Sequence, residues 1–197
     1  MSTRVPAPRS SMRKEPRQAR SRATVEVIVR AGARVLGDRG WAGFTTNEVA
    51  VVAGVSIGSL YQYFPDKLAL IDAIRRRHLD DVLAVMRGLG KDGQPLDRLV
   101  DDLVCGMIAA HSIHPALHRV LLDEVPGGAE ARSMHRAFEA EYLERYHAVV
   151  AASARRDDSH AETMVQVLSA AVEGVIHRAA RRGTLKSPEL KRELGTT

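Results

Sequence analysis

Apolar residues recur along this chain at intervals of three and four positions, which is the period of an amphipathic α-helix. The first stripe begins at Gln18, and the glycines Gly37 and Gly40 predict where its helix ends. No segment alternates apolar and polar residues with period two, so we expect an all-α fold of about nine helices, the last one after Pro188. Longer stripes predict helices over residues 67–89, 96–112, 115–124, 129–155 and 160–182.

Two short helices are predicted after the first stripe from the residues at their ends. Thr45 and Glu48 form a capping box, in which the threonine hydroxyl accepts a backbone N–H and the glutamate reaches back to the cap. Gly54 supplies the left-handed residue that ends this helix, and Ser56 begins the next one, which runs to Tyr63. Two short helices joined by a tight turn predict a helix-turn-helix, whose second helix enters the major groove of DNA.

The outward residues of the second short helix suit that role. Ser56, Gly58 and Ser59 are slim enough to approach base edges, and Ile57 offers an apolar contact such as one to a thymine methyl. Gln62 can read adenine or reach a phosphate. Polar groups that suit phosphate oxygens are those of Thr45, Tyr61, Tyr63 and Lys67. The alternative is a helical hairpin with an ordinary polar surface.

The stretch FTTNEVAVVAGVSIGSLYQYFPDK resembles the DNA-binding domain of the TetR/AcrR family of bacterial transcriptional regulators, over about residues 20–75. The resemblance implies a near-palindromic DNA operator, a small-molecule effector in the C-terminal part, and a homodimer formed by the last two long helices. Many members carry a basic residue at the position of Ile57, so its absence here gives more weight to phosphate contacts. The resemblance implies DNA contacts by Thr45, Thr46, Ser56, Ile57, Gly58, Ser59, Tyr61, Gln62, Tyr63 and Lys67.

Positive charge is concentrated at the N-terminus. The first 22 residues carry +6, whereas the whole chain carries +5. Residues 1–17 have three prolines and no apolar period, which predicts a disordered basic arm of the kind that binds nucleic acid. We therefore divide the chain into this arm, a helix-turn-helix domain over 18–66, and an effector-binding and dimerisation domain over 67–197. The single cysteine and the absence of a long apolar run predict a cytoplasmic protein with no membrane partner.

Several residues of the C-terminal part are candidates for the wall of an effector cavity. Glu173 and His177 stand one helical turn apart, where they can orient a polar effector. The alternative for each candidate is ordinary core packing or a surface pair. The candidates are Met86, Cys105, Met107, His111, Phe138, Tyr142, Met164, Glu173 and His177.

Metal binding and catalysis are the two other classes of function to weigh. His111, His114 and His118 have a spacing that can ligate zinc, together with Cys105 or Glu124, although histidines are also common at helix ends. Residues 54–58 match the G-x-S-x-G string of serine hydrolases, but that motif follows a buried strand and a helix is expected here. We assign no cofactor, no metal and no enzymatic activity. The sequence favours a repressor that a small molecule releases from its operator; the alternatives are an activator, or a metal or small-molecule sensor with little DNA role.

Overall fold

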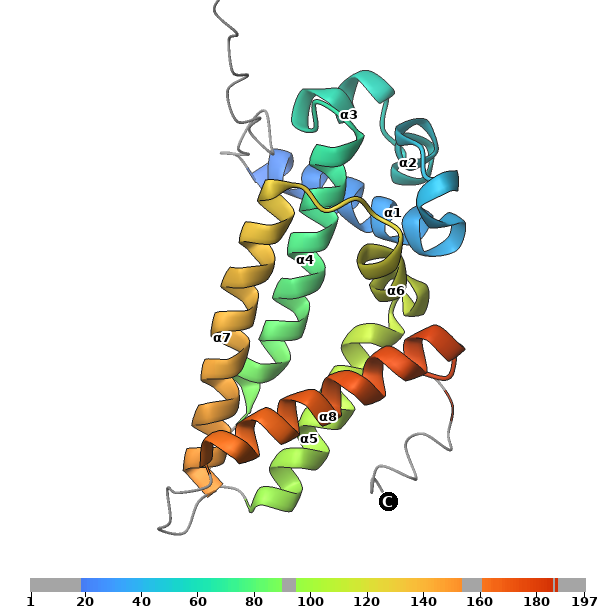
Figure 1. Ribbon diagram of the computed structural model, residues 1–197. Coiled ribbons are helices and arrows are strands. Elements are labelled where there is room, and N and C mark those ends of the chain that lie inside the picture. The colour runs from blue at the N-terminus through green and yellow to red at the C-terminus, as the bar shows by residue number, and fades with distance from the viewer. Residues whose placement is uncertain (1–18, 90–94, 154–160, 186, 188–197) are drawn as a thin grey trace, which may run out of the picture.

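The computed structural model describes residues 19–89, 95–153, 161–185 and 187, and all regular secondary structure within these ranges is helical (Figure 1). The all-α prediction is therefore confirmed. The expected ninth helix after Pro188 and the basic arm over 1–17 lie outside the described residues. The helices are α1 (Ala19–Gly43), α2 (Thr46–Ala53), α3 (Ile57–Tyr63), α4 (Lys67–Gly88), α5 (Leu96–Ser112), α6 (Pro115–Asp123), α7 (Ala129–Ser153) and α8 (Ala161–Arg182).

The short helices begin and end at the residues that the sequence predicts. Thr45, Ser56 and Asp66 each accept, through a side-chain oxygen, the backbone N–H three residues later, at 3.2, 3.0 and 2.8 Å. Gly54 ends α2 with φ of 66°, and its left-handed conformation turns the chain toward α3. These local bonds satisfy backbone donors that a helix start leaves free, and so they set the positions of α2, α3 and α4.

The first helix runs past its predicted end. Gly37 lies inside α1 beside α6, so it does not end the helix. A Cβ there would stand 3.7 Å from the backbone nitrogen of Leu117, which is an ordinary contact distance. The helical path breaks at Gly40, with φ of 67°. Between the two glycines, Arg39 donates from Nε to the Glu48 carboxylate at 3.1 Å. Glu48 thus pairs with Arg39 of α1 rather than with the backbone of Thr45. This corrects the expected capping box, of which only the bond from the Glu48 backbone N–H to the Thr45 hydroxyl is present.

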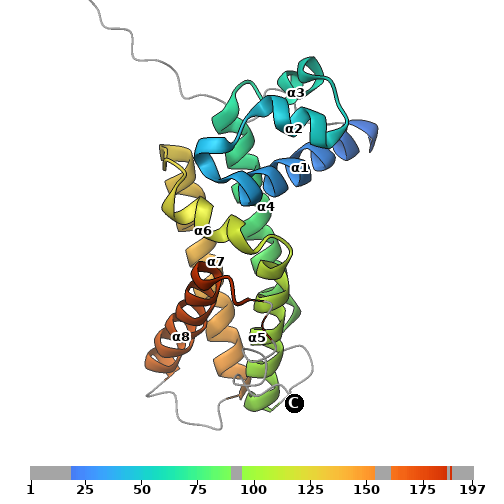
Figure 2. The same cartoon turned by 90° about the vertical axis from the view of Figure 1, so that its right-hand side faces the viewer.

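The apolar side chains pack into two cores that share one helix. The first core joins α1, α2 and α3 to the first half of α4, through Leu70, Ile71 and Ile74, and also takes in α6. The second core joins the other half of α4 to α5, α7 and α8. Figure 2 shows α4 passing from one group to the other. Both α4 and α6 therefore pack directly against the helices of the helix-turn-helix.

No helix within the described part of the chain combines the length and the apolar character needed to cross a membrane.

Candidate functional site

The third helix lies at the outer end of the molecule, with one face fixed in the core and the other open to solvent (Figures 1 and 2). Leu60 and Phe64 are fully buried in the first core, so they hold α3 in place. On the opposite face, Ile57 exposes 37% of its surface and Tyr61 exposes 40%, and Gln62 is exposed beside them. The face that the sequence predicts to enter the major groove is thus free to do so.

Hydroxyl groups on this open surface are held in place by one another. The Tyr61 hydroxyl lies 3.0 Å from Thr46 Oγ1, which joins α3 to the start of α2. Ser56 and Ser59 pair at 2.8 Å at the start of α3. In each pair one hydroxyl donates its only proton to the other, so one hydroxyl of each pair keeps a proton that it can donate to a phosphate oxygen.

Two of the ten predicted DNA-contact residues have packing roles inside the protein. Lys67 Nζ lies 3.7 Å from the centroid of the Trp41 ring and donates to the Trp41 carbonyl at 3.2 Å. This partly buried setting lowers the pKa of Lys67 through desolvation. Tyr63 is also partly buried and packs against the first core. The lysine therefore ties the start of α4 to the end of α1, a role that the sequence analysis did not foresee.

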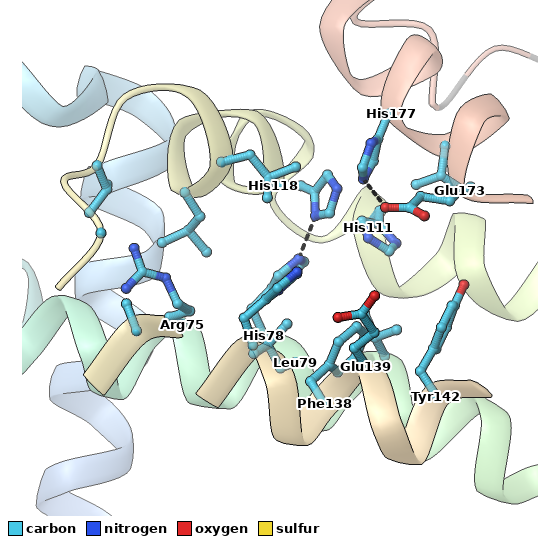
Figure 3. Close-up of a pocket in the computed structure, with 18 of the residues that line it drawn as sticks. Arg75, His78, Leu79, His111, His118, Phe138, Glu139, Tyr142, Glu173 and His177 are labelled. Carbon is cyan, nitrogen blue, oxygen red and sulfur yellow. Dashed lines mark hydrogen bonds and ion pairs between the residues drawn. The ribbon is translucent and has the colours of Figure 1, made fainter. Parts of the chain in front are cut away.

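A cavity of about 550 Å³ opens between α4, α5, α6, α7 and α8 (Figure 3). Its wall is mainly apolar, with a minority of charged and imidazole groups that point inward. Six of the nine predicted cavity residues line it, namely Met107, His111, Phe138, Tyr142, Glu173 and His177.

The other three candidates lie elsewhere, which corrects the sequence analysis. Met86 is fully buried inside the second core, Cys105 is exposed on α5, and Met164 is exposed on the outer side of α8. A helical stripe shows which side of a helix meets a neighbour, but it does not show whether that neighbour leaves a space.

Three imidazoles from three different helices meet at the wall of the cavity. His78 comes from α4, His111 from α5 and His118 from α6, and one nitrogen of each lies within 4.8 Å of the others. The sequence grouped His114 with His111 and His118, but the third member in space is His78, which the helical period placed on the buried stripe of α4. In the sequence, His78 is recognisable only as a polar residue on the otherwise apolar face of its helix, between Ile74 and Val82.

The members of this cluster hold defined hydrogen bonds. His78 Nε2 lies 2.8 Å from His118 Nδ1, and His111 Nδ1 lies 2.8 Å from the Met107 carbonyl oxygen. The ring of His177 is close by, with its centroid 4.5 Å from that of His118, and His177 Nε2 lies 3.7 Å from the Glu173 carboxylate.

Burial keeps these three imidazoles uncharged. Desolvation, followed by repulsion from the neighbouring histidines, lowers the pKa of His78 to about 3 and that of His118 to about 2. Desolvation also lowers the pKa of His111, against an opposing effect of its bond to Met107. At neutral pH all three therefore present neutral rings.

A steep loss of stability at acid pH is expected from this cluster. Unfolded histidines take up protons near pH 6.5, whereas folded His78 and His118 stay neutral down to about pH 3 and 2. The unfolded state thus binds more protons over this window, so the free energy of unfolding falls as pH drops below 6.5, by about 1.4 kcal/mol per unit for each such group. Urea unfolding from pH 7 to pH 5 in metal-free buffer measures this slope. A slope that stays the same in His118→Gln would contradict the assignment.

The chain matches two family descriptions that together span most of its length. Residues 28–74 match "Bacterial regulatory proteins, tetR family", and residues 95–196 match "Tetracyclin repressor-like, C-terminal domain". The second match alone covers more than half of the chain. No curated protein matches the sequence.

Solved structures share the fold at low sequence identity. The fatty acid degradation regulator FadR from Bacillus halodurans is 14% identical, with a TM-score of 0.70 over 87% of this chain and 90% of that one. A TetR transcription regulator from Haloarcula marismortui is 19% identical, with a TM-score of 0.70 over 87% and 94%. FadR from Bacillus subtilis, solved with stearoyl-CoA, is 14% identical, with a TM-score of 0.66 over 87% and 98%. With its helix-turn-helix and C-terminal helical domain both matched, the chain belongs to the tetR family of bacterial regulatory proteins.

Proposed function

We propose that this protein is a homodimeric repressor that binds operator DNA through α3 and leaves it when a small molecule occupies the cavity. The observation that carries the proposal is the path of α4. Its first half, with Leu70 and Ile74, packs in the core of the helix-turn-helix, and its second half lines the cavity with Leu79 and Val82. A ligand that displaces the second half therefore tilts the first.

A second connection runs from the cavity through α6. Glu124, just after α6, accepts from the Trp41 backbone N–H at 2.9 Å and from Arg119. Gly40 lies so close that a Cβ there would stand 2.9 Å from a Glu124 carboxylate oxygen. Displacement of α6 thus moves the end of α1 directly, and typical coupling between two such sites is about 1–3 kcal/mol.

The cavity wall favours an effector with an apolar body and an anionic group. Leu121, Val125, Phe138 and Ile176 supply apolar surface, and the guanidinium groups of Arg75, Arg132 and Arg136 are the cations of the wall. Arg75 already pairs with Asp72 at 3.1 Å. Arg132 donates to the Gly127 carbonyl at 3.0 Å, but its charge and that of Arg136 stay available to an anionic group. Stearoyl-CoA, bound by the Bacillus subtilis neighbour, has this combination of an apolar chain and an anionic head.

An exposed apolar stripe on α8 supports the dimer. Met164, Val167, Ala171 and Gly174 follow one another at intervals of three and four and face solvent in the single chain. Small residues along such a stripe let a second helix approach closely, as in the four-helix interfaces of bundles. By contrast Val165 and several other apolar residues of α8 are buried in the second core of the chain itself. The apolar residues of α8 therefore serve both the core of the chain and the proposed dimer contact.

The test is a selection of random-sequence duplexes by the purified full-length chain. We expect enrichment of a near-palindrome with half-sites one helical turn apart, about 10 base pairs centre to centre. Straight-chain carboxylates and their CoA thioesters are then expected to release the selected duplex. Leu79→Trp, which places a larger side chain in the cavity wall and narrows the cavity, should bind the duplex normally and resist release. Absence of enrichment at low salt would overturn the DNA-binding proposal, and release of Leu79→Trp at the same ligand concentration would place the effector elsewhere.

A further inference from the structure

The convergence of His78, His111 and His118 is not explained by packing alone. The exposed fractions of His78 and His111 are 9% and 2%, and the cluster is surrounded by a mainly apolar wall. Burying a polar ring without full hydrogen bonding is unfavourable, and leucine or phenylalanine would fill the same space without that cost. Three such rings from three separate helices indicate a ligand that uses their nitrogen atoms together.

The hydrogen bond of His111 to the backbone orients its lone pair. A carbonyl oxygen only accepts, so the proton of His111 is on Nδ1, where it bonds Met107 O at 2.8 Å, and Nε2 carries the lone pair. Metal-bound histidines are commonly held by such a bond from their other nitrogen. The structure therefore presents His111 in the tautomer that a metal ion requires.

His118 supplies an independent observation. Its Nδ1 is bonded to His78 Nε2, but its Nε2 is buried with no hydrogen-bond partner among the described residues. Leaving a buried polar atom unpaired costs about 1–3 kcal/mol. A bound ligand that pairs with this nitrogen would remove that cost. With the His118 proton on Nδ1, donated to His78 Nε2, the lone pair is on Nε2, and a cation bound there satisfies it.

We propose that His78, His111 and His118 bind a divalent transition metal ion, with Zn²⁺ the ion that the ligand set suits best. Imidazole is a preferred ligand of Zn²⁺, which takes three protein ligands and one open position where it also binds a water or a small molecule. The cluster borders the cavity beside His177 and Glu173, so a small molecule in the cavity has access to a bound ion (Figure 3).

The distances define what binding does to the fold. Ligand nitrogens around tetrahedral Zn²⁺ lie about 3.4 Å apart, whereas those of the cluster spread over as much as 4.8 Å. Binding of the ion therefore rearranges the three rings and replaces the 2.8 Å hydrogen bond between His78 and His118. It stabilises the folded chain because the unfolded chain lacks the preformed site. The proposed metal site does not depend on the proposed repressor function, because the binding experiment that tests it contains no DNA.

The test uses the full-length chain without a histidine tag, stripped with a chelator and titrated with Zn²⁺ by calorimetry and with Co²⁺ by visible absorption. We expect one ion per chain, Co²⁺ bands of tetrahedral intensity, and a higher melting temperature with metal. His111→Gln and His118→Gln should each weaken binding by more than about 100-fold, since loss of an outer partner alone costs 10–100-fold. His135→Gln is the matched control, because His135 is an exposed histidine of the same cavity wall outside the cluster.

Two results would overturn the proposal. One is a wild-type chain that binds neither ion. The other is unchanged affinity in both His111→Gln and His118→Gln, which would place the ion at another group. Circular dichroism of each variant reports its folding, and if one variant fails to fold, the other variant and the wild-type Co²⁺ spectrum still decide.

Discussion

Tyr61→Ala is expected to lower operator affinity by about 10- to 100-fold and to leave the free energy of unfolding nearly unchanged. The Tyr61 side chain is 40% exposed on the open face of α3, so its removal leaves no cavity in the core. Its hydroxyl lies 3.0 Å from Thr46 Oγ1, which fixes both groups before DNA arrives. Loss of a hydrogen bond to a charged phosphate costs about 1.5–3 kcal/mol, which corresponds to the expected range.

Fluorescence anisotropy at one fixed salt concentration measures this change. Tyr61→Phe keeps the ring and removes only the hydroxyl, so it should reproduce most of the loss. Ile113→Ala serves as the control, because this side chain is 67% exposed at the junction of α5 and α6, far along the chain from α3. Operator affinity unchanged in Tyr61→Ala would mean that another surface of the protein contacts DNA.

The helix-turn-helix was predictable because its signals are local. A cap such as Thr45 or Ser56 bonds an amide three residues away, and Gly54 needs only its own backbone angle to end α2. Each of these bonds forms within a few residues, so the sequence around it contains all the information needed. The same reason explains the correct start of α4 at Asp66.

Contacts between distant segments were not predictable from local patterns. A glycine that ends a helix and a glycine inside a helix look alike in sequence, so Gly37 is predicted as a terminator although α1 continues past it and α6 packs beside it. The position of α6 in the core of the helix-turn-helix rests on the buried side chains of Leu117, Val120 and Leu121, which come from a distant segment of the chain. His78 joined the histidine cluster only because α4 passes beside α6, a crossing that no spacing within α4 records.

The cavity was predictable only in part, for a related reason. Phe138 and Tyr142 lie one turn apart on α7 and face inward together, as helical spacing predicts. Met86 has the same apolar character on α4, yet α5, α7 and α8 close around it and leave no space. Whether a buried side chain borders a cavity depends on how its neighbours fill the volume, and that is a property of the packed structure.

Val167→Glu is expected to convert the dimer into a folded monomer and to weaken operator binding by about 10²–10⁴-fold, the gain that joining two binding units typically provides. Val167 exposes 63% of its surface on the outer stripe of α8, so the substitution spares the core of the single chain. Across the proposed twofold interface, two glutamates would be buried without partners, and burying an unpaired charge costs several kcal/mol. A monomer then presents one recognition helix to two half-sites.

Sedimentation equilibrium and operator binding, measured on the same preparation, decide this prediction together. Ala109→Glu is the matched control, since it adds the same charge at an exposed position on α5, away from the stripe. The control should remain dimeric and bind DNA normally, which would separate the effect of position from that of charge. If Val167→Glu stays dimeric, the twofold contact must lie on a face other than this stripe of α8. If it is monomeric and yet binds the full operator with unchanged affinity, the two half-sites are not read by paired α3 helices.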